Sequence, residues 1–331
     1  MRGASVSDTS GITRRSGLRA LAFGFTGAQA TALIILVAAI ILGPAVLYPV
    51  FLMKVLCFAL FASAFNLLPG YVGLLSFGHA AYFGMGSYLA AWTAKYWGID
   101  AEIAILIGGA AAGALGLVFG WLAIRRQGIY FAMITLALAE MVYFFCTEAS
   151  FTGGEDGIQQ VPRAKLLGIF SMQPDMSLYW LVAFVFLAGF LLIHRIIHSP
   201  FGLVLQAIRE NEPRAISLGY RVDQYKLLAF VLSAALAGIA GATKSQVFGI
   251  ATLTDVHSSM SGEVVLITLI GGIGTVFGPV VGALLFGALE TYLAPFGDWV
   301  TVTQGAIFVA CVLAFRRGLI GELAARLRLS L

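Results

Sequence analysis

Charged residues are scarce in this chain: Asp, Glu, Lys and Arg together make up 11% of its 331 residues. Soluble domains carry about 25% of these residues. Hydrophobic residues reach 60%, which is more apolar side chain than one soluble core can hide. The composition therefore excludes a soluble enzyme, a disordered chain and a secreted disulfide scaffold. It predicts an all-α protein, a polytopic bundle of transmembrane helices in a lipid bilayer.

Groupings that would bind a metal or a nucleotide are also missing. The three cysteines stand alone in apolar runs, as small buried hydrophobes do. His194 and His198 have i,i+4 spacing, but beside Arg195 at the end of a span they are better explained as an interfacial anchor. Segment 238–245 lacks the glycine before lysine that a phosphate-binding loop needs. We expect no catalytic residue, cofactor or metal, and no nucleic-acid partner.

Ten mainly apolar stretches have the roughly 20 residues that a helix needs to cross a bilayer. The last three lie so close together that eight or nine spans is the alternative. The predicted spans are 28–47, 49–68, 78–97, 101–122, 128–147, 177–197, 226–249, 262–277, 279–295 and 299–315.

Most of the 20 basic residues fall on one side of a ten-span bundle. Because Lys and Arg concentrate in cytoplasmic loops, both termini are predicted to be cytoplasmic. The predicted organisation is a cytoplasmic tail (1–27), a transmembrane domain (28–315) and a basic cytoplasmic tail (316–331). The domain carries a periplasmic loop at 148–176 and a cytoplasmic loop at 198–225.

The cytoplasmic loop has the pattern of a short amphipathic helix that ends at Pro213 or Gly219. Its Arg and Glu side chains are expected to point outward, and Val204, Leu205 and Ile208 inward. Long ordered loops are more often functional than ornamental.

Charged residues inside predicted spans are the next candidates, because burying them is costly. Glu140 lies well inside the fifth span. It is either a pathway or helix-positioning carboxylate, or a carboxylate bonded to neighbouring helices. Lys54 is expected to snorkel to the outer surface, and Glu263 and Glu290 to reach the interface.

Two glycine-rich interruptions, 69–79 and 271–279, stand one in each half of the chain. Broken helices in corresponding places of two halves indicate a translocation path, whereas the alternative is close helix packing. The predicted path residues are Gly70, Tyr71, Gly73, Ser76, Gly78, His79, Glu140, Gly271, Gly272 and Gly274.

At these residues the chain resembles the LivM-type permeases of branched-chain amino acid ABC importers, within the LivH/LivM and ribose-permease-like group. The resemblance covers most of residues 60–290. The matching segments are 66–88, 128–137, 152–158, 207–212, 218–219, 225–231 and 271–279.

The resemblance implies an importer in the bacterial inner membrane. It would hold a second, LivH-like permease, two cytoplasmic ATPase subunits and a periplasmic solute-binding protein. It also implies that 198–225 is the loop that docks on the ATPase. Pro213 and Arg214 depart from the family's small or apolar residues. The residues that match the pattern of the loop are Arg209, Glu210, Glu212, Ala215 and Gly219.

The expected mechanism is alternating access driven by a separate ATPase. Branched-chain amino acids are the expected solutes, while close relatives of the family carry amides, urea or other small solutes. The apolar spans show no obvious fixed charge pair for a zwitterion. A stand-alone, ion-coupled secondary transporter that uses Glu140 is the second hypothesis. An intramembrane enzyme would need a catalytic constellation that the sequence lacks.

Overall fold

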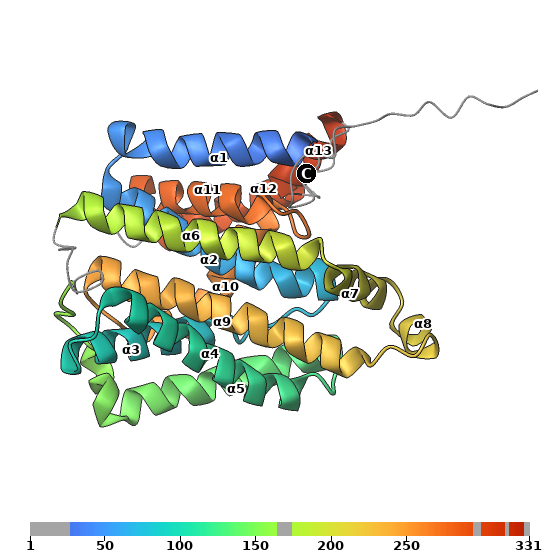
Figure 1. The fold of residues 1–331 in the computed structure, drawn as a ribbon, viewed down its shortest axis with the longest axis horizontal. Coiled ribbons are helices and arrows are strands. Elements are labelled where there is room, and N and C mark those ends of the chain that lie inside the picture. Colours follow the sequence, from blue (N-terminus) through green and yellow to red (C-terminus); the bar gives the residue numbers. More distant parts are fainter. Residues whose placement is uncertain (1–26, 164–173, 294–298, 315–317, 328–331) are drawn as a thin grey trace, which may run out of the picture.

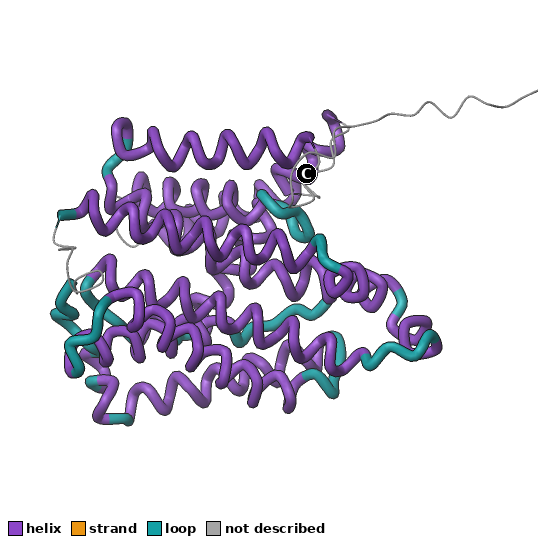
Figure 2. The backbone as a smooth tube through the Cα atoms, in the orientation of Figure 1, coloured by secondary structure: helices purple, strands orange, loops and turns teal. Residues whose placement is uncertain are grey.

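The structure, a computed structural model, describes residues 27–163, 174–293, 299–314 and 318–327. Across these residues helices form the fold and no sheet is present (Figure 2). The α-helices are α1 (Gly27–Val46), α2 (Pro49–Leu67), α3 (His79–Tyr96), α4 (Ala101–Ala123), α5 (Ile129–Glu148), α6 (Asp175–Ile197), α7 (Pro200–Glu210), α8 (Glu212–Ser217), α9 (Val222–Phe248), α10 (Ser258–Gly271), α11 (Gly278–Leu293), α12 (Trp299–Ala314) and α13 (Gly318–Leu327). Short helical turns add η1 (Leu68–Val72), η2 (Ser150–Thr152), η3 (Gly154–Asp156) and η4 (Leu253–Asp255).

Each of the ten predicted spans overlaps one helix, from α1 to α6 and from α9 to α12, although the bounds differ by several residues and the helices differ in length. Six segments among the described residues are long and apolar enough to cross a membrane. They belong to α1, α2 with η1, α4, α5, α6 and α9. Helices α10 and α11 are apolar but shorter. The predicted tail 1–27 lies outside the described residues apart from Gly27, and the basic tail contains α13.

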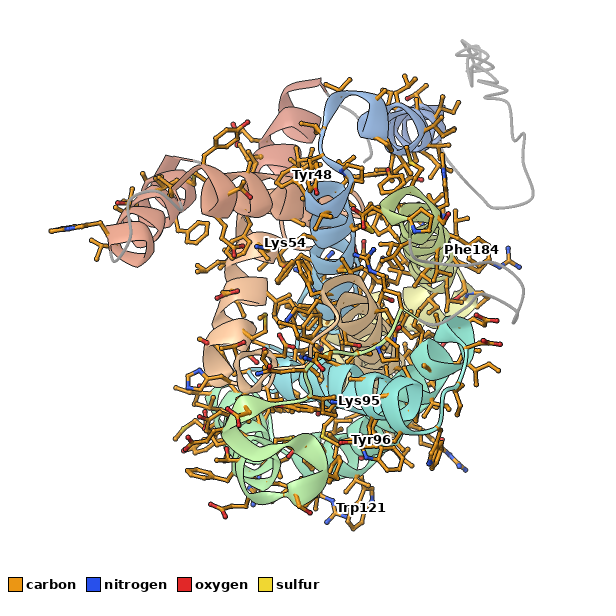
Figure 3. The ribbon with its side chains drawn as sticks, turned by 90° about the vertical axis from the view of Figure 1, so that its left-hand side faces the viewer. Tyr48, Lys54, Lys95, Tyr96, Trp121 and Phe184 are labelled. Atoms are coloured by element: carbon orange, nitrogen blue, oxygen red, sulfur yellow. The ribbon has the colours of Figure 1, made fainter. Side chains whose placement is uncertain are left out.

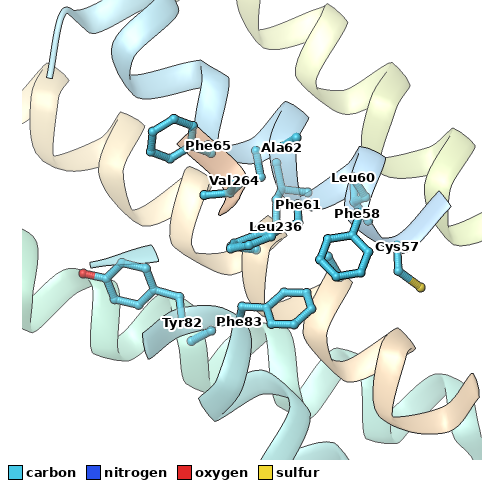
Figure 4. Close-up of a cluster of buried hydrophobic side chains, with 14 of the residues drawn as sticks. Cys57, Phe58, Leu60, Phe61, Ala62, Phe65, Tyr82, Phe83, Leu236 and Val264 are labelled. Carbon is cyan, nitrogen blue, oxygen red and sulfur yellow. The ribbon is translucent and has the colours of Figure 1, made fainter. Parts of the chain in front are cut away.

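Helices α2 and α9 form the centre of the bundle. Helix α9 packs against α2, α3 and α4, while α2 packs against α6, α10 and α11. Figure 4 shows aromatic side chains of α2 and α3 filling the space between them; the ring centroids of Phe61 and Phe83 are 4.4 Å apart. Such contacts suit a bilayer, where packing rather than water exclusion holds helices together.

Small residues let α3, α4 and α9 approach closely. A Cβ atom on Gly86 would overlap the backbone of Gly238, and one on Gly241 would overlap the backbone of Phe83. Glycine at these positions is therefore required for backbone contact between helices, which is the usual role of small residues in membrane bundles.

Figure 1 shows α7 and α8 projecting together from one end of the bundle. The short amphipathic helix predicted in 198–225 is α7, but it ends at Glu210, before Pro213, and a second helix, α8, follows the break at Asn211. The side chain of Asn211 caps α8 by accepting the backbone N–H of Arg214 at 3.0 Å. Pro213 then lies in the first turn of α8, where a missing N–H costs nothing, so it begins a helix instead of ending one. We call residues 199–221 the α7–α8 hairpin.

Candidate functional site

The first glycine-rich interruption turns the chain back into the bundle. Helix α2 continues into the π-helical turn η1, and the chain then reverses at Gly73, whose φ is 84°. Residues 73–78 return without helical structure to the buried start of α3. Side chains satisfy their backbone: the N–H of Phe77 donates to Thr135 Oγ1 at 3.1 Å. Irregular backbone at membrane depth is tolerated only where protein or a cavity supplies such partners.

The second interruption lies between α10 and α11 and meets the first. Asn66 donates from Nδ2 to the carbonyl of Thr275 at 2.9 Å and accepts the N–H of Gly274 on Oδ1 at 3.0 Å. The Tyr71 hydroxyl donates to the carbonyl of Gly274 at 3.1 Å. A Cβ on Gly70 would lie 3.0 Å from the backbone of Gly274. The structure thus brings the two predicted interruptions into direct contact; we call Asn66, Gly70, Tyr71 and Gly274 the inner junction.

The α7–α8 hairpin reaches this inner junction through Arg209. Although this residue remains exposed, its guanidinium turns toward the bundle and donates from Nη1 to the carbonyl of Gly70. Its aliphatic stem lies against Gly73, where an added Cβ would be 3.2 Å from Arg209 Cγ. The prediction of an outward Arg209 is therefore wrong for the guanidinium. Beside this contact, the hairpin and the junction together border a cavity of about 460 Å³, lined by Gly70, Tyr71, Gln206, Arg209, Glu210 and Gly274.

A second polar contact holds the hairpin at Glu212. Lys226 Nζ, on a side chain that is almost wholly buried, pairs with Glu212 Oε1 at 2.6 Å. Gln127 Nε2, from the joint between α4 and α5, donates to Glu212 Oε2 at 2.8 Å. Glu212 therefore joins the hairpin to two other segments of the same chain.

Apolar packing fixes the inner face of the hairpin. Leu205 and Ile208 are buried as predicted, and Val204 is half-buried. Ala215 is buried with Ile208 in a small cluster. Gly219, which follows α8, has a φ of 89°, a conformation that favours glycine.

Most of the other predicted path residues are buried inside the bundle, away from the hairpin. Ser76 and His79 are fully buried, and His79 Nε2 is hydrogen-bonded to Ser233 Oγ at 2.9 Å. A Cβ on Gly78 would lie 2.8 Å from the carbonyl oxygen of Thr135. Gly271 and Gly272 are likewise buried at the end of α10. Glu140 is half-buried on α5, and among the described residues it makes no hydrogen bond or ion pair.

Sequence reasoning missed the partners in these contacts. Asn66, Gln127 and Lys226 are polar residues in or beside apolar runs, and that signal was available. It also missed that Lys54 is paired: its Nζ lies 2.6 Å from Glu290 Oε1 instead of snorkelling alone.

Interrupted helices in the two halves of a bundle are found in membrane transport proteins. Residues 48–315 match the family described as "Branched-chain amino acid transport system / permease component". The chain belongs to this family and is a multi-pass permease of the inner membrane, not an enzyme.

Relatives of the chain carry matching names. The LivM permease protein of the high-affinity branched-chain amino acid transport system of Escherichia coli is 27% identical, over 80% of this chain and 68% of the relative. The LivH permease protein of Salmonella typhimurium is 24% identical, over 80% of this chain and 91% of the relative. The autoinducer 2 import system permease protein LsrC of Klebsiella pneumoniae is 30% identical, over 57% of this chain and 54% of the relative. No solved structure matches the chain significantly.

Proposed function

We propose that this chain is one of two permease subunits in an ATP-binding-cassette importer that moves branched-chain or related amino acids into the cell by alternating access. The family and the LivM and LivH relatives support both the solute class and the pairing with a LivH-like permease. Two cytoplasmic ATPase subunits and a periplasmic solute-binding protein complete the proposed complex. The ATPase subunits hydrolyse the nucleotide, and this chain moves the solute.

The proposed topology has ten spans within residues 28–315 and both termini in the cytoplasm. The α7–α8 hairpin and the joint that carries Arg125 and Arg126 lie at one end, since Gln127 is bonded to Glu212. Basic residues therefore gather at the hairpin end, which supports its assignment to the cytoplasm. The loop 148–176 then lies in the periplasm.

The hairpin is proposed to dock on the ATPase. At its surface Leu203, Ile216 and Leu218 are 64%, 57% and 70% exposed. In the proposed topology this surface faces the cytoplasm, where no lipid covers it. Apolar side chains in such a place, rimmed by charged residues, are typical of a protein interface.

The observation that carries the proposal is the contact chain from the hairpin to the inner junction. Arg209 binds the carbonyl of Gly70, and Asn66 and Tyr71 join that segment to Gly274. When ATP closes the ATPase pair, a displacement of α7 therefore acts on both interruptions together, as rigid elements do in switching proteins. In this scheme Gly70, Tyr71, Gly73 and Gly274 border the inner end of the path. Ser76, Gly78, His79, Gly271 and Gly272 support them from inside.

The test is reconstitution of this chain with its second permease and ATPase subunits in vesicles, with the solute-binding protein added outside. We expect leucine uptake that requires both ATP and the binding protein. Accumulation by this chain alone on an ion gradient would overturn the proposal and favour the secondary transporter. One relative is named as an autoinducer 2 permease, so relatives of this chain are not all named for amino acids. Urea, amides and other small solutes are therefore included in the same assay as competitors.

A further inference from the structure

The cavity between the α7–α8 hairpin and the inner junction has the size of a ligand site. Its volume of about 460 Å³ lies within the range of about 300–1,000 Å³ that small-molecule sites occupy. One wall is α7, which packs against η1 beside the end of α2 (Figure 1). The other wall is the inner junction. Arg209 and Glu210 are exposed, so the cavity is open at the hairpin end of the bundle.

The wall formed by α7 carries three polar side chains. Gln206, Arg209 and Glu210 have i, i+3 and i+4 spacing, which places them on one face of the helix, and all three line the cavity. Within the described part of the chain neither Arg209 nor Glu210 forms an ion pair, whereas Glu212 is paired with Lys226. A guanidinium and a carboxylate therefore line the same cavity, and no side chain neutralises either of them.

Most of the hydrogen-bonding capacity of Arg209 is unused. A guanidinium has five N–H donors, and among the described residues Arg209 donates only to the carbonyl of Gly70. Its Nη1 also lies beside the second interruption, 3.5 Å from the position of a Cβ on Gly274. The remaining N–H groups can bind a carboxylate, for which a planar guanidinium is well suited, and the contact with Gly70 can persist.

The charges of the cavity favour a zwitterion over a simple anion or cation. Arg209 and Glu210 are the charged residues of its lining, and their charges cancel. A lone anion would pair with Arg209 but would be repelled by Glu210, and a lone cation would have the opposite difficulty. An amino acid carries one charge of each sign and can pair with both. On the junction wall, the Tyr71 hydroxyl donates to the carbonyl of Gly274 at 3.1 Å, so its oxygen can still accept a hydrogen bond.

We propose that this cavity binds an amino acid from the cytoplasm and that the bound amino acid slows import. Its carboxylate pairs with Arg209 and its ammonium with Glu210. The inference rests on the proposed function and adds regulation to it: the transported solute limits its own uptake once it has accumulated inside.

The position of the cavity explains the inhibition. A solute in it contacts α7 on one side and the inner junction on the other. In the proposed mechanism ATP displaces α7, which changes the distance between these two walls. A ligand that bridges both walls stabilises the present arrangement over the displaced one, and it therefore shifts the equilibrium against the next cycle.

The first experiment tests the chemistry of the ligand on the wild-type transporter in lipid nanodiscs, where both sides are accessible. ATP hydrolysis is driven by binding protein already saturated with leucine, and free L-leucine is then added in excess. We expect hydrolysis to fall at least about fivefold, within the usual range of coupling between sites. The same concentration of 4-methylpentanoate, which lacks the ammonium, or of 3-methylbutylamine, which lacks the carboxylate, should have little effect. Equal inhibition by 4-methylpentanoate would indicate an anion site and overturn the proposal.

The second experiment tests the side of the membrane. The full transporter is reconstituted in vesicles with its ATPase subunits and ATP inside and with labelled leucine and binding protein outside. Unlabelled leucine sealed inside should slow the initial uptake, and the same excess outside a vesicle with an empty lumen should not slow ATP hydrolysis. ATP-dependent uptake that is insensitive to internal leucine would overturn the regulation and leave the proposed function intact. Uptake that needs no ATP would overturn both.

The third experiment locates the site with Glu210→Gln, in which each variant is compared with itself in the presence and absence of internal leucine. Loss of the partner of the ammonium should raise the leucine concentration for half-inhibition about tenfold, as expected for one hydrogen bond to a charged group. Glu210→Asp should retain part of the sensitivity. Asp223→Asn removes an exposed carboxylate at the same end of the bundle but outside the cavity, and it should keep the wild-type value. Wild-type inhibition in Glu210→Gln would place the regulatory site elsewhere. The ligand series on the wild type decides the proposal if this variant does not assemble.

Discussion

One guanidinium, that of Arg209, connects the surface hairpin with the interior of the bundle. It donates to the carbonyl of Gly70, and its stem covers Gly73. Arg209→Gln keeps a polar side chain but is too short to span both contacts. We expect leucine uptake by the reconstituted complex to fall about tenfold, with ATP hydrolysis largely retained, because force from the ATPase no longer reaches the junction.

Arg126→Gln is the control for this prediction. Arg126 is exposed at the same end of the bundle but outside the hairpin. Arg126→Gln should leave the rates of leucine uptake and ATP hydrolysis unchanged. Coupled transport at the wild-type ratio of solute to ATP in Arg209→Gln would show that the contact has no role in coupling.

Gly70 is a residue where one methyl group decides the geometry. Its Cβ would lie 2.6 Å from Asn66 Oδ1 and 3.0 Å from Gly274. Gly70→Ala must therefore separate the two interruptions and weaken the hydrogen bonds of Asn66, each worth about 1 kcal/mol. We expect most uptake to be lost while the complex still assembles. Gly305→Ala, where a Cβ on α12 meets nothing within 4 Å, should have no effect; equal uptake by both variants would contradict the junction.

At the scale of the element, the α7–α8 hairpin is held as a unit by Glu212. Glu212→Lys places a second ammonium beside the nearly buried Lys226, and a buried pair broken in this way is strongly destabilising. We expect a displaced hairpin and at least about tenfold weaker recovery of the ATPase in pull-down, which corresponds to about 1.4 kcal/mol. The double variant with Lys226→Glu restores the pair with reversed charges and should regain much of the loss. Failure of this rescue would mean that Glu212 contacts the ATPase itself.

The exposed face of the α7–α8 hairpin is the surface proposed to bind the ATPase. Leu218 is 70% exposed just after α8. Leu218→Asp should leave the permease folded but weaken ATPase binding about tenfold, because burying a carboxylate in an apolar interface is unfavourable. Trp97→Asp at the opposite end is the control for pull-down of the ATPase. Equal recovery by both variants would place the docking surface elsewhere.

Across the whole molecule, the helices were predictable because a bilayer demands long apolar segments. The interruptions at 69–79 and 271–279 were visible as glycine-rich breaks, and segment 198–225 as a polar loop. Their meeting was not, since Asn66 and Gly274 are 208 positions apart and no local pattern reports such a contact. The break at Asn211 was hidden for another reason: proline both ends helices and begins them, and the capping side chain of Asn211 decides between the two.

The charge pairs show the same limit. Lys54 and Glu290 each look like residues that reach the membrane surface, and only the packing of α2 against α11 turns them into partners. The sequence shows which charged residues lie in apolar segments, but it does not show which of them form ion pairs. The structure therefore adds what the sequence could not show: the α7–α8 hairpin and the Lys54–Glu290 pair lie at opposite ends of the bundle (Figure 1, Figure 3).

The roles proposed for the two ends of the bundle depend on its orientation in the membrane. If basic residues mark the cytoplasm, a cysteine at Arg214 on α8 is accessible from inside and one at Glu155 from outside; both residues are exposed. Thr152 in the same outer loop is fully buried and would not react. Cys57, Cys146 and Cys311 are first replaced by alanine, so that a membrane-impermeant maleimide reports only the new thiol. We expect Glu155→Cys to be labelled in intact cells and Arg214→Cys only after permeabilisation. The reverse pattern would put the hairpin in the periplasm, out of reach of any ATPase, and would overturn the proposed coupling.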